Sequence, residues 1–318
     1  MVNIRVLTLV IIASVIITGC NFHREEKNGE TLAEAIFNTP TSTYVEPSIT
    51  PLPSMEPSPV LLPSPSPTPT LVPPTPVLEK GKNLDFEALN RLDGSARGWG
   101  VVLNNNHSTP EVPASIRNLV AKYDGFYVGD TSRKKVYIIF SASSEGGYTN
   151  RILDTLRDNN VNSVFFLVGS YVKANPQLVR RMLDEGHHVG NHSMTHPSLP
   201  KVGNTKLQEE MLSFEKYMSK EFNASVKYFM PPSGEYSEKV MGAAKQLGYK
   251  TIFWSFAYVD FYPDKHNGAD YAYNMVMNNL HNGAFIFLHT ISRDNAEALD
   301  RILKDIKAQG YDIGPFDI

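Results

Sequence analysis

The 318-residue sequence has little cysteine, no excess of charge of one sign and no long apolar run. The single cysteine, Cys20, excludes an internal disulfide, so a folded domain has to be stabilised by its hydrophobic core. The formal net charge is −3 and no basic run is present, which argues against nucleic acid as a partner. The most apolar stretch, at the start of the chain, is too short to cross a bilayer comfortably.

The first 20 residues have the proportions of an export signal and resemble a bacterial lipoprotein signal peptide. Arg5 precedes an apolar stretch from Val6 to Ile17, and Cys20 follows Gly19. This arrangement predicts cleavage before Cys20 and a diacylglyceryl group on its sulfur. The mature protein would then be extracytoplasmic and anchored to the cell membrane. The alternative is an ordinary signal peptide in which the cysteine is incidental.

Residues 21–82 are predicted to be a disordered linker rich in proline, serine and threonine. Prolines recur every few residues between Pro40 and Pro76, and proline fixes φ and removes a backbone donor. At roughly 3.1 Å per residue, such a tether could reach on the order of 150 Å. It would carry the folded domain from the membrane into the cell wall. A proline-rich ligand for another domain is the less favoured interpretation, because such tracts in exported proteins are usually stalks.

The folded part is expected to comprise a preceding segment, residues 83–133, and a main domain, residues 134–318. In the main domain strand-like runs alternate with helical patterns. The expected strands are 136–140, 161–168, 188–190, 227–229, 249–255 and 284–288, and the expected helices are 176–185, 206–222, 237–247, 270–280 and 295–308. Repeated βα units predict parallel strands in an α/β barrel or open sheet, with the functional site at the carboxyl ends of the strands.

Five segments at these strand ends carry candidate functional residues: 136–141 (VYIIFS), 191–197 (NHSMTHP), 229–234 (FMPPSG), 254–260 (WSFAYVD) and 287–290 (FLHT). This ordered set resembles the polysaccharide deacetylases of the NodB-homology type, and most of all the branch that de-N-acetylates muramic acid to form the δ-lactam of spore cortex. The resemblance covers roughly residues 95–317. It implies a distorted (β/α) barrel, with segment 83–133 wrapped around it. It also implies a role in sporulation, a monomer, and peptidoglycan or another N-acetylated glycan as the partner.

His192 and His196 are the candidate metal ligands. They are four residues apart, which predicts that both side chains point to one side of a helical turn. The resemblance implies a divalent metal, zinc, that polarises the acetamide carbonyl and activates water. The alternative is a pair of structural histidines. By the same resemblance, Pro231, Gly234 and Trp254 are expected to contact the substrate.

Three positions depart from the family pattern. Ser141 stands where the family has the aspartate that acts as base, and a hydroxyl without a neighbouring base cannot deprotonate water at neutral pH. Ala142 stands at the third-ligand position and has no donor atom, so zinc on two histidines would bind weakly or not at all. Met230 replaces the arginine that orients the base. The loss of both partners of an ion pair can be nearly neutral, so the replacements are expected to compensate each other.

Two other segments keep the family pattern. The resemblance implies that Asp260 orients His289, which acts as the general acid on the leaving amine. The alternatives are a surface acid and a histidine bonded to the backbone. Glu145 is the only carboxylate in the loop after Ser141, and it is an alternative base or ligand.

Three functional hypotheses follow. The chain is a lipid-anchored deacetylase-like protein that binds cell-wall glycan with weak turnover or none, because the base, a ligand and the arginine are replaced. Alternatively it is an active N-deacetylase that uses Glu145 or a metal hydroxide. In the third hypothesis it is a non-catalytic lipoprotein that presents a surface to another wall or spore protein.

Overall fold

The computed structural model describes residues 83–316 and 318. The predicted signal peptide with Cys20 and the predicted linker, residues 21–82, lie outside these residues. Within the described residues, no helix has the length and apolar character needed to cross a membrane.

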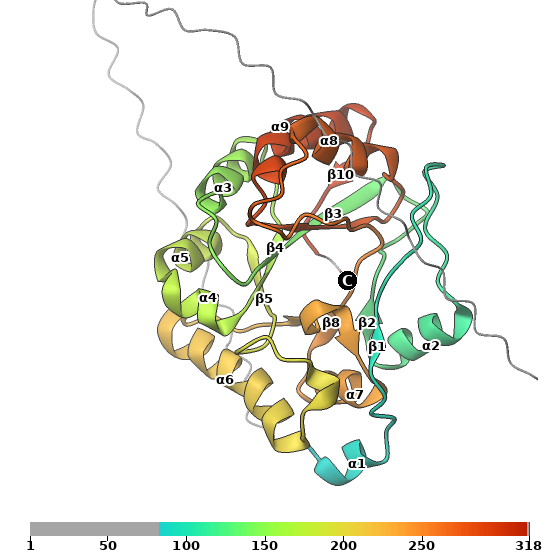
Figure 1. The fold of residues 1–318 in the computed structure, drawn as a ribbon, viewed down its shortest axis with the longest axis vertical. Coiled ribbons are helices and arrows are strands. Elements are labelled where there is room, and N and C mark those ends of the chain that lie inside the picture. Colours follow the sequence, from blue (N-terminus) through green and yellow to red (C-terminus); the bar gives the residue numbers. More distant parts are fainter. Residues whose placement is uncertain (1–82, 317) are drawn as a thin grey trace, which may run out of the picture. The chain divides into compact units, whose positions relative to one another are not determined.

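A curled parallel sheet forms the centre of the fold (Figure 1). Its strands run in the order β10-β3-β4-β5-β6-β8-β2, and β9 pairs with residues 137–141 of β3. The hydrogen-bonded neighbours in this sheet are parallel. The strand bounds are β2 Gly125–Phe126, β3 Lys135–Ala142, β4 Val164–Leu167, β5 His188–Asn191, β6 Tyr228–Phe229, β8 Lys250–Ile252, β9 Phe285–His289 and β10 Asp312–Ile313.

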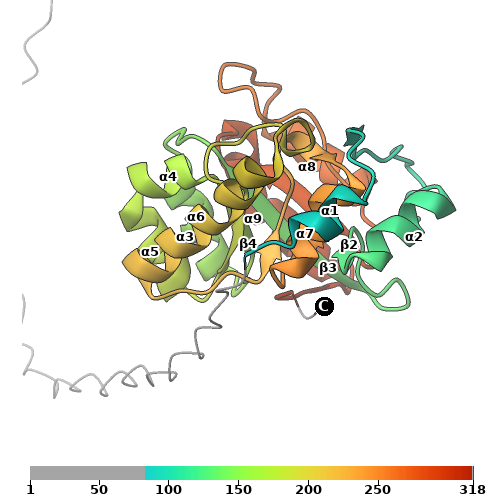
Figure 2. The ribbon, with the colours of Figure 1, turned by 90° about the horizontal axis from the view of Figure 1, so that it is seen from below.

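Helices cover the outside of the sheet (Figures 1 and 2). Their bounds are α3 Thr149–Asp158, α4 Gly169–Ala174, α5 Pro176–Asp184, α6 Asn204–Phe222, α7 Glu238–Gln246, α8 Ala269–Asn278 and α9 Arg293–Ala308. The strands β4 and β3 are buried almost throughout because side chains cover both of their faces. One face packs under the helices and the other fills the inside of the curled sheet.

The predicted α/β class with parallel strands is confirmed, and most predicted elements are found within a few residues of their expected ends. Ser237 caps α7, its hydroxyl accepting the N–H of Val240. The expected strand 249–255 was too long, because regular pairing in β8 ends at Ile252 and only an isolated bridge between Phe256 and Ile286 follows. The short helix α4 was not predicted.

Segment 83–133 packs against the β6–β8 side of the sheet. It contains α1 (Phe86–Asn90), β1 (Arg97–Gly98), α2 (Ala114–Lys122) and β2. Strand β1 pairs antiparallel with β7 (Glu235–Tyr236), and β2 extends the main sheet beside β8. Trp99 is the central contact: its backbone N–H donates to the carbonyl of Gly234 at 2.8 Å and its Nε1–H to the carbonyl of Trp254 at 2.9 Å. The segment therefore braces two loops at the carboxyl ends of the strands.

His187 lies at the other end of the sheet, and we predict that it makes stability fall in acid. Its Nδ1 accepts the backbone N–H of Ser163 at 3.1 Å, and burial lowers its pKa from 6.5 to about 4. Between these pH values the unfolded chain binds a proton that the folded chain rejects, so unfolding becomes easier as the pH falls.

The substitution His187→Asn keeps an acceptor for Ser163 but removes the titrating group. We then expect the free energy of unfolding of the variant, measured with urea between pH 7 and pH 4, to fall less steeply with pH than that of the unchanged chain. The difference should reach up to about 1.4 kcal/mol per pH unit. If the free energy of unfolding falls equally steeply with pH in both chains, His187 does not contribute to the loss of stability in acid.

Candidate functional site

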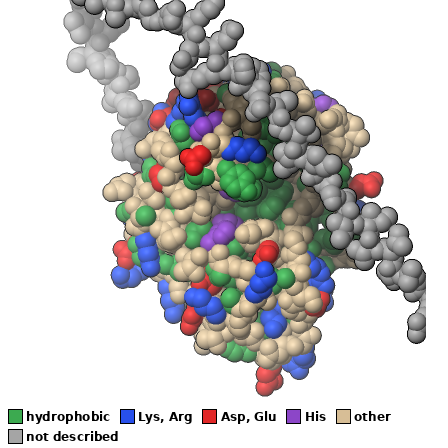
Figure 3. Space-filling model, viewed as in Figure 1, with side chains coloured by type: hydrophobic (Ala, Val, Ile, Leu, Met, Phe, Trp, Pro, Cys, Tyr) green, Lys and Arg blue, Asp and Glu red, His purple; other side chains and the backbone are tan. Residues whose placement is uncertain are grey.

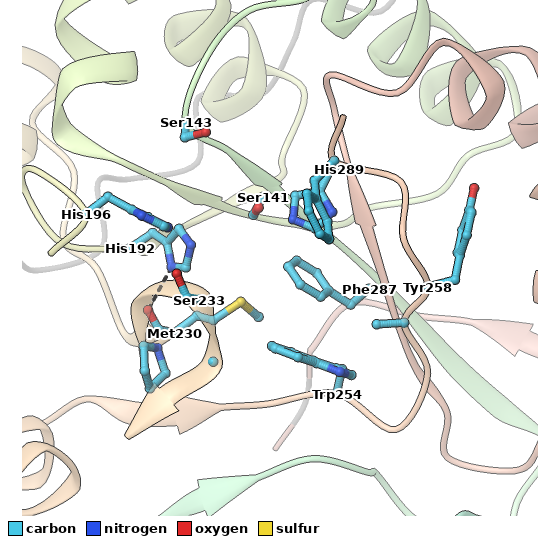
Figure 4. A pocket seen from close by; sticks show the side chains of 14 residues that line it. Ser141, Ser143, His192, His196, Met230, Ser233, Trp254, Tyr258, Phe287 and His289 are labelled. Atoms are coloured by element: carbon cyan, nitrogen blue, oxygen red, sulfur yellow. Dashed lines mark hydrogen bonds between the residues drawn. The ribbon is translucent and has the colours of Figure 1, made fainter. Parts of the chain in front are cut away.

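A pocket of about 380 Å³ opens where the strands of the sheet end (Figure 4). Figure 3 shows histidine and hydrophobic side chains gathered around a hollow on this face. The pocket is lined by Ser141, Ser143, His192, His196, Met230, Pro231, Ser233, Gly234, Trp254, Ala257, Tyr258, Phe261, Phe287 and His289. All of the predicted site residues at strand ends lie here except Asp260 and Ala142. The lining contains no aspartate, glutamate, lysine or arginine.

His192 and His196 lie together on one side of the pocket, with ring centroids 4.9 Å apart. The predicted helical turn was wrong: the segment after β5 is a loop, in which Ser193 and His196 both adopt left-handed backbone angles. Nδ1 of His192 lies 2.8 Å from the carbonyl oxygen of Met230 and therefore carries the hydrogen, which leaves Nε2 with a free lone pair. Burial, followed by the neighbouring His196, lowers the pKa of His192 to about 3, so its imidazole is neutral at pH 7.

Glu210 on α6 holds this histidine loop in place. Its buried carboxylate accepts the backbone N–H groups of Met194 at 2.9 Å and Thr195 at 2.7 Å, and also the Thr195 hydroxyl at 2.7 Å. Lys206 lies 2.8 Å from the same carboxylate and balances its charge. Glu210 was missed because an acid on an amphipathic helix looks like a solvent-facing residue.

We predict that Glu210→Ala lowers the free energy of unfolding by about 2–4 kcal/mol, because two backbone donors of the loop lose their acceptor. Glu210→Gln, whose amide oxygen can still accept, should cost less. Urea denaturation of the two variants measures both effects. Equal and negligible losses would mean that Glu210 does not hold the loop.

His289 stands on the opposite side of the pocket, at the end of β9. Its Nδ1 lies 2.6 Å from Oδ1 of Asp260, whose other oxygen accepts the backbone N–H of His289 at 2.8 Å. Asn295 Nδ2 donates to the same oxygen at 2.6 Å, so three hydrogen bonds hold the buried carboxylate of Asp260. The hydrogen bond to Asp260 fixes the ring and directs Nε2 away from Asp260. The predicted pairing of Asp260 with His289 is present, and Asn295 is an additional member that the sequence analysis missed.

Apolar side chains form the rest of the wall. Phe287 stacks on Trp254 at 4.7 Å and contacts the ring of His289 at the same centroid distance (Figure 4). Gly234 has a φ of +66°, and a Cβ at this position would lie 2.8 Å from the Trp254 ring. Glycine is therefore required for the close approach of the loop to Trp254.

Comparison with known proteins gives the family. The model of the polysaccharide deacetylase family matches residues 128–252. The peptidoglycan-N-acetylmuramic acid deacetylase PdaA of Bacillus subtilis is 42% identical over 223 residues, covering 69% of this chain and 84% of PdaA. The chain belongs to the polysaccharide deacetylase family.

Solved structures of family 4 carbohydrate esterases share the fold of this chain. The structure of Bacillus subtilis PdaA matches with a TM-score of 0.69 and 41% identity, covering 70% of this chain and 96% of that chain. BA3943 of Bacillus anthracis, described as a pseudoenzyme of the family, matches with a TM-score of 0.57 and 29% identity, covering 60% and 67%. A mutant of BA3943 is described as having restored enzymatic activity.

Ser141 lies in the pocket of this family member, at the position where the family resemblance predicted the base. It pairs with His289 in the register of β3 and β9, and Figure 4 shows it between the rings of His192 and His289. Ala142 does not line the pocket; it is buried in the main hydrophobic core. Ser143 lines the pocket instead, two residues after Ser141, as the alternation of side chains along a strand allows.

Glu145 is not brought to the pocket. Its carboxylate accepts the backbone N–H of Gly147 at 2.7 Å and the hydroxyls of Thr149 at 2.5 Å and Tyr171 at 2.8 Å. These bonds hold it at the start of α3. In this conformation it cannot act as the substitute base.

The residues of the pocket do not fit a firmly bound metal. His192 and His196 offer two nitrogen ligands, whereas protein zinc sites use three or four protein ligands. Among residues 83–316 and 318, no group of three or more histidine, cysteine, aspartate or glutamate side chains is arranged to hold a metal ion. The donor set of a catalytic zinc site is therefore incomplete.

Several lining residues were not predicted: Ser143, Ser233, Ala257, Tyr258, Phe261 and Phe287. Tyr258 lies in the fourth segment, 254–260, and Phe261 directly follows that segment, so their closeness in sequence to Asp260 was the available signal. The hydroxyl and aromatic side chains give the pocket hydrogen-bonding groups and flat apolar surfaces without a permanent charge. Such a pocket suits a neutral polar ligand.

Proposed function

We propose that this protein binds N-acetylated sugars of peptidoglycan in the deacetylase pocket but hydrolyses their amide bonds weakly or not at all. The observation that carries the proposal is a pocket with three imidazoles and no carboxylate. A general base contributes about 10²–10⁴-fold to rate, so its replacement by Ser141 removes most of the hydrolytic power. The buried Met230 and Ala142 take the places where an arginine and a metal ligand are expected.

Peptidoglycan is proposed as the ligand because PdaA, similar along most of its length, is named for its action on N-acetylmuramic acid in peptidoglycan. Loss of activity within the family has a precedent in BA3943. Within this proposal the chain is an exported lipoprotein, held at the cell membrane through Cys20, with the linker placing the domain in the wall. The proposal includes a role in the spore wall, because the sequence most resembles the branch that forms the δ-lactam of spore cortex.

The alternative of an active deacetylase rests on the intact pair of His289 and Asp260. This pair can donate a proton to a leaving amine, but it supplies no group that activates water. Activity would therefore need a metal or a base delivered from outside the described pocket. The hypothesis of a purely partner-binding protein predicts no affinity for glycan.

Calorimetric titration of the full-length chain with N-acetylated muropeptides separates these possibilities. We expect saturable binding that needs the N-acetyl group and is weakened about tenfold by Trp254→Ala, a truncation in the pocket wall. The matched control is Val102→Ala, which removes an exposed apolar side chain outside the pocket lining. The absence of glycan binding would overturn the proposal and favour the partner-binding hypothesis. A parallel titration with zinc should show weak binding or none.

A further inference from the structure

A serine hydroxyl and an oriented imidazole face each other inside the pocket. Ser141 and His289 are directly paired residues of the parallel strands β3 and β9, and both line the pocket. The side chains of paired residues in neighbouring strands point to the same face of a sheet. Figure 4 shows Ser141 next to the ring of His289. The hydroxyl that replaced the expected carboxylate is therefore a neighbour of an imidazole.

The hydrogen bonds of His289 leave its second ring nitrogen able to accept a proton. Nδ1 lies 2.6 Å from Oδ1 of Asp260 and donates its hydrogen to it, so Nε2 carries a lone pair. Asp260 is itself held by the backbone N–H of His289 and the amide of Asn295. A hydroxyl beside a histidine that a buried acid orients is the arrangement that activates serine for acyl transfer.

We propose that Ser141 is a nucleophile that takes the acyl group from small esters of neutral alcohols. In this proposal His289 is its base, and Asp260 is the residue that orients His289. The inference goes beyond the proposed function, which concerns glycan binding and the amide bond. It agrees with the absence of a group that activates water, because His289 here serves a hydroxyl that the protein holds beside it.

The lining of the pocket favours an ester without charge. It contains no acidic side chain, lysine or arginine, and Met230, Trp254 and Phe287 offer apolar contacts to the acyl and alcohol groups. The hydroxyls of Ser143 and Ser233 lie in the same lining and can donate to the carbonyl oxygen as it gains negative charge. Esters are favoured over amides because an alcohol leaves an acyl carbon more readily than an amine does.

The acyl transfer balances without a further reactant. Oγ of Ser141 forms a bond to the acyl carbon, and its proton passes to Nε2 of His289. The bond between the acyl carbon and the ester oxygen then breaks, and the leaving alcohol takes the proton from His289. The products are an acylated Ser141 and a free alcohol.

The test uses 4-nitrophenyl acetate and the full-length chain, with EDTA present to suppress any metal-dependent reaction. The reaction is stopped with acid, and mass spectrometry of the peptides locates the acetyl groups. We expect acetylation of Ser141, slowed by about 10²-fold or more in His289→Ala and in Asp260→Asn, both of which keep the serine. Ser141→Ala should lose the matching release of nitrophenol. The control Ser213→Ala, at an exposed serine of α6, should behave like the unchanged chain.

The proposal is overturned if the acetyl groups are found only on other residues, or if His289→Ala acetylates Ser141 as fast as the unchanged chain does. Urea unfolding of each variant verifies that a slower reaction is not due to loss of the fold. Asp260→Asn retains a side chain of the same size, so a slower reaction in this folded variant points to the orientation of His289. The probe contains no sugar, so failure here leaves the proposed glycan binding untouched.

Discussion

The combined substitutions Ser141→Asp, Ala142→Asn and Met230→Arg are expected to raise acetate release from N-acetylated muropeptides by about 10²-fold or more. The new aspartate would supply the missing base, whose usual contribution is about 10²–10⁴-fold. It would stand beside His289 in the β3–β9 register, in the same pocket as His192 and His196. Acetate is quantified over time with zinc present, against the unchanged chain.

Two comparisons make this expectation specific. Adding His289→Ala to the three substitutions should abolish most of the gain, because the leaving amine would lose its proton donor. Glu145→Gln should not reduce any activity found, because Glu145 is bound at the start of α3. No gain from the three substitutions would mean that the pocket has diverged at other positions as well.

The single substitution Met230→Arg is expected to destabilise the fold by about 3–5 kcal/mol. Met230 is fully buried among apolar side chains of the inner core, and the pocket lining holds no carboxylate to pair with a new cation. A buried charge without a partner carries a penalty of this size. Denaturant unfolding of the full-length chain measures the loss.

Adding Ser141→Asp should recover part of that loss, because an ion pair would form within the pocket. The coupling free energy is obtained from the two single variants and the double variant. Met230→Leu is the matched control and should cost less than about 1.5 kcal/mol. If Met230→Arg is tolerated like the control, or shows no coupling to Ser141→Asp, the two positions are not the former partners of an ion pair.

Much of the fold could be predicted from the sequence because helices and strands of the main domain have strong periodic patterns. The run Val136–Phe140 and the heptad-like spacing on α6 are examples, and their strand and helix are found where expected. The strand ends also located the site, since parallel strands place their carboxyl ends at one edge of the sheet. The structure brings four of the residues predicted on that basis into one pocket: His192, His196, Ser141 and His289.

Other features depended on tertiary contacts that leave no local pattern. The histidine loop has left-handed residues and is held by Glu210 from another helix, so the spacing of His192 and His196 suggested a helical turn that does not form. The place of Glu145 was set by Tyr171, 26 residues away. The bracing of Gly234 by Trp99 joins residues 135 positions apart in the chain, a contact that periodicity cannot reveal.

The most direct measurement is acetate release by the unchanged full-length chain, incubated with N-acetylated peptidoglycan strands under conditions in which it binds them and with zinc supplied. We expect bound glycan and no acetate above the level of the His289→Ala variant. Sustained, zinc-dependent acetate release that His289→Ala abolishes would contradict the proposed loss of hydrolysis.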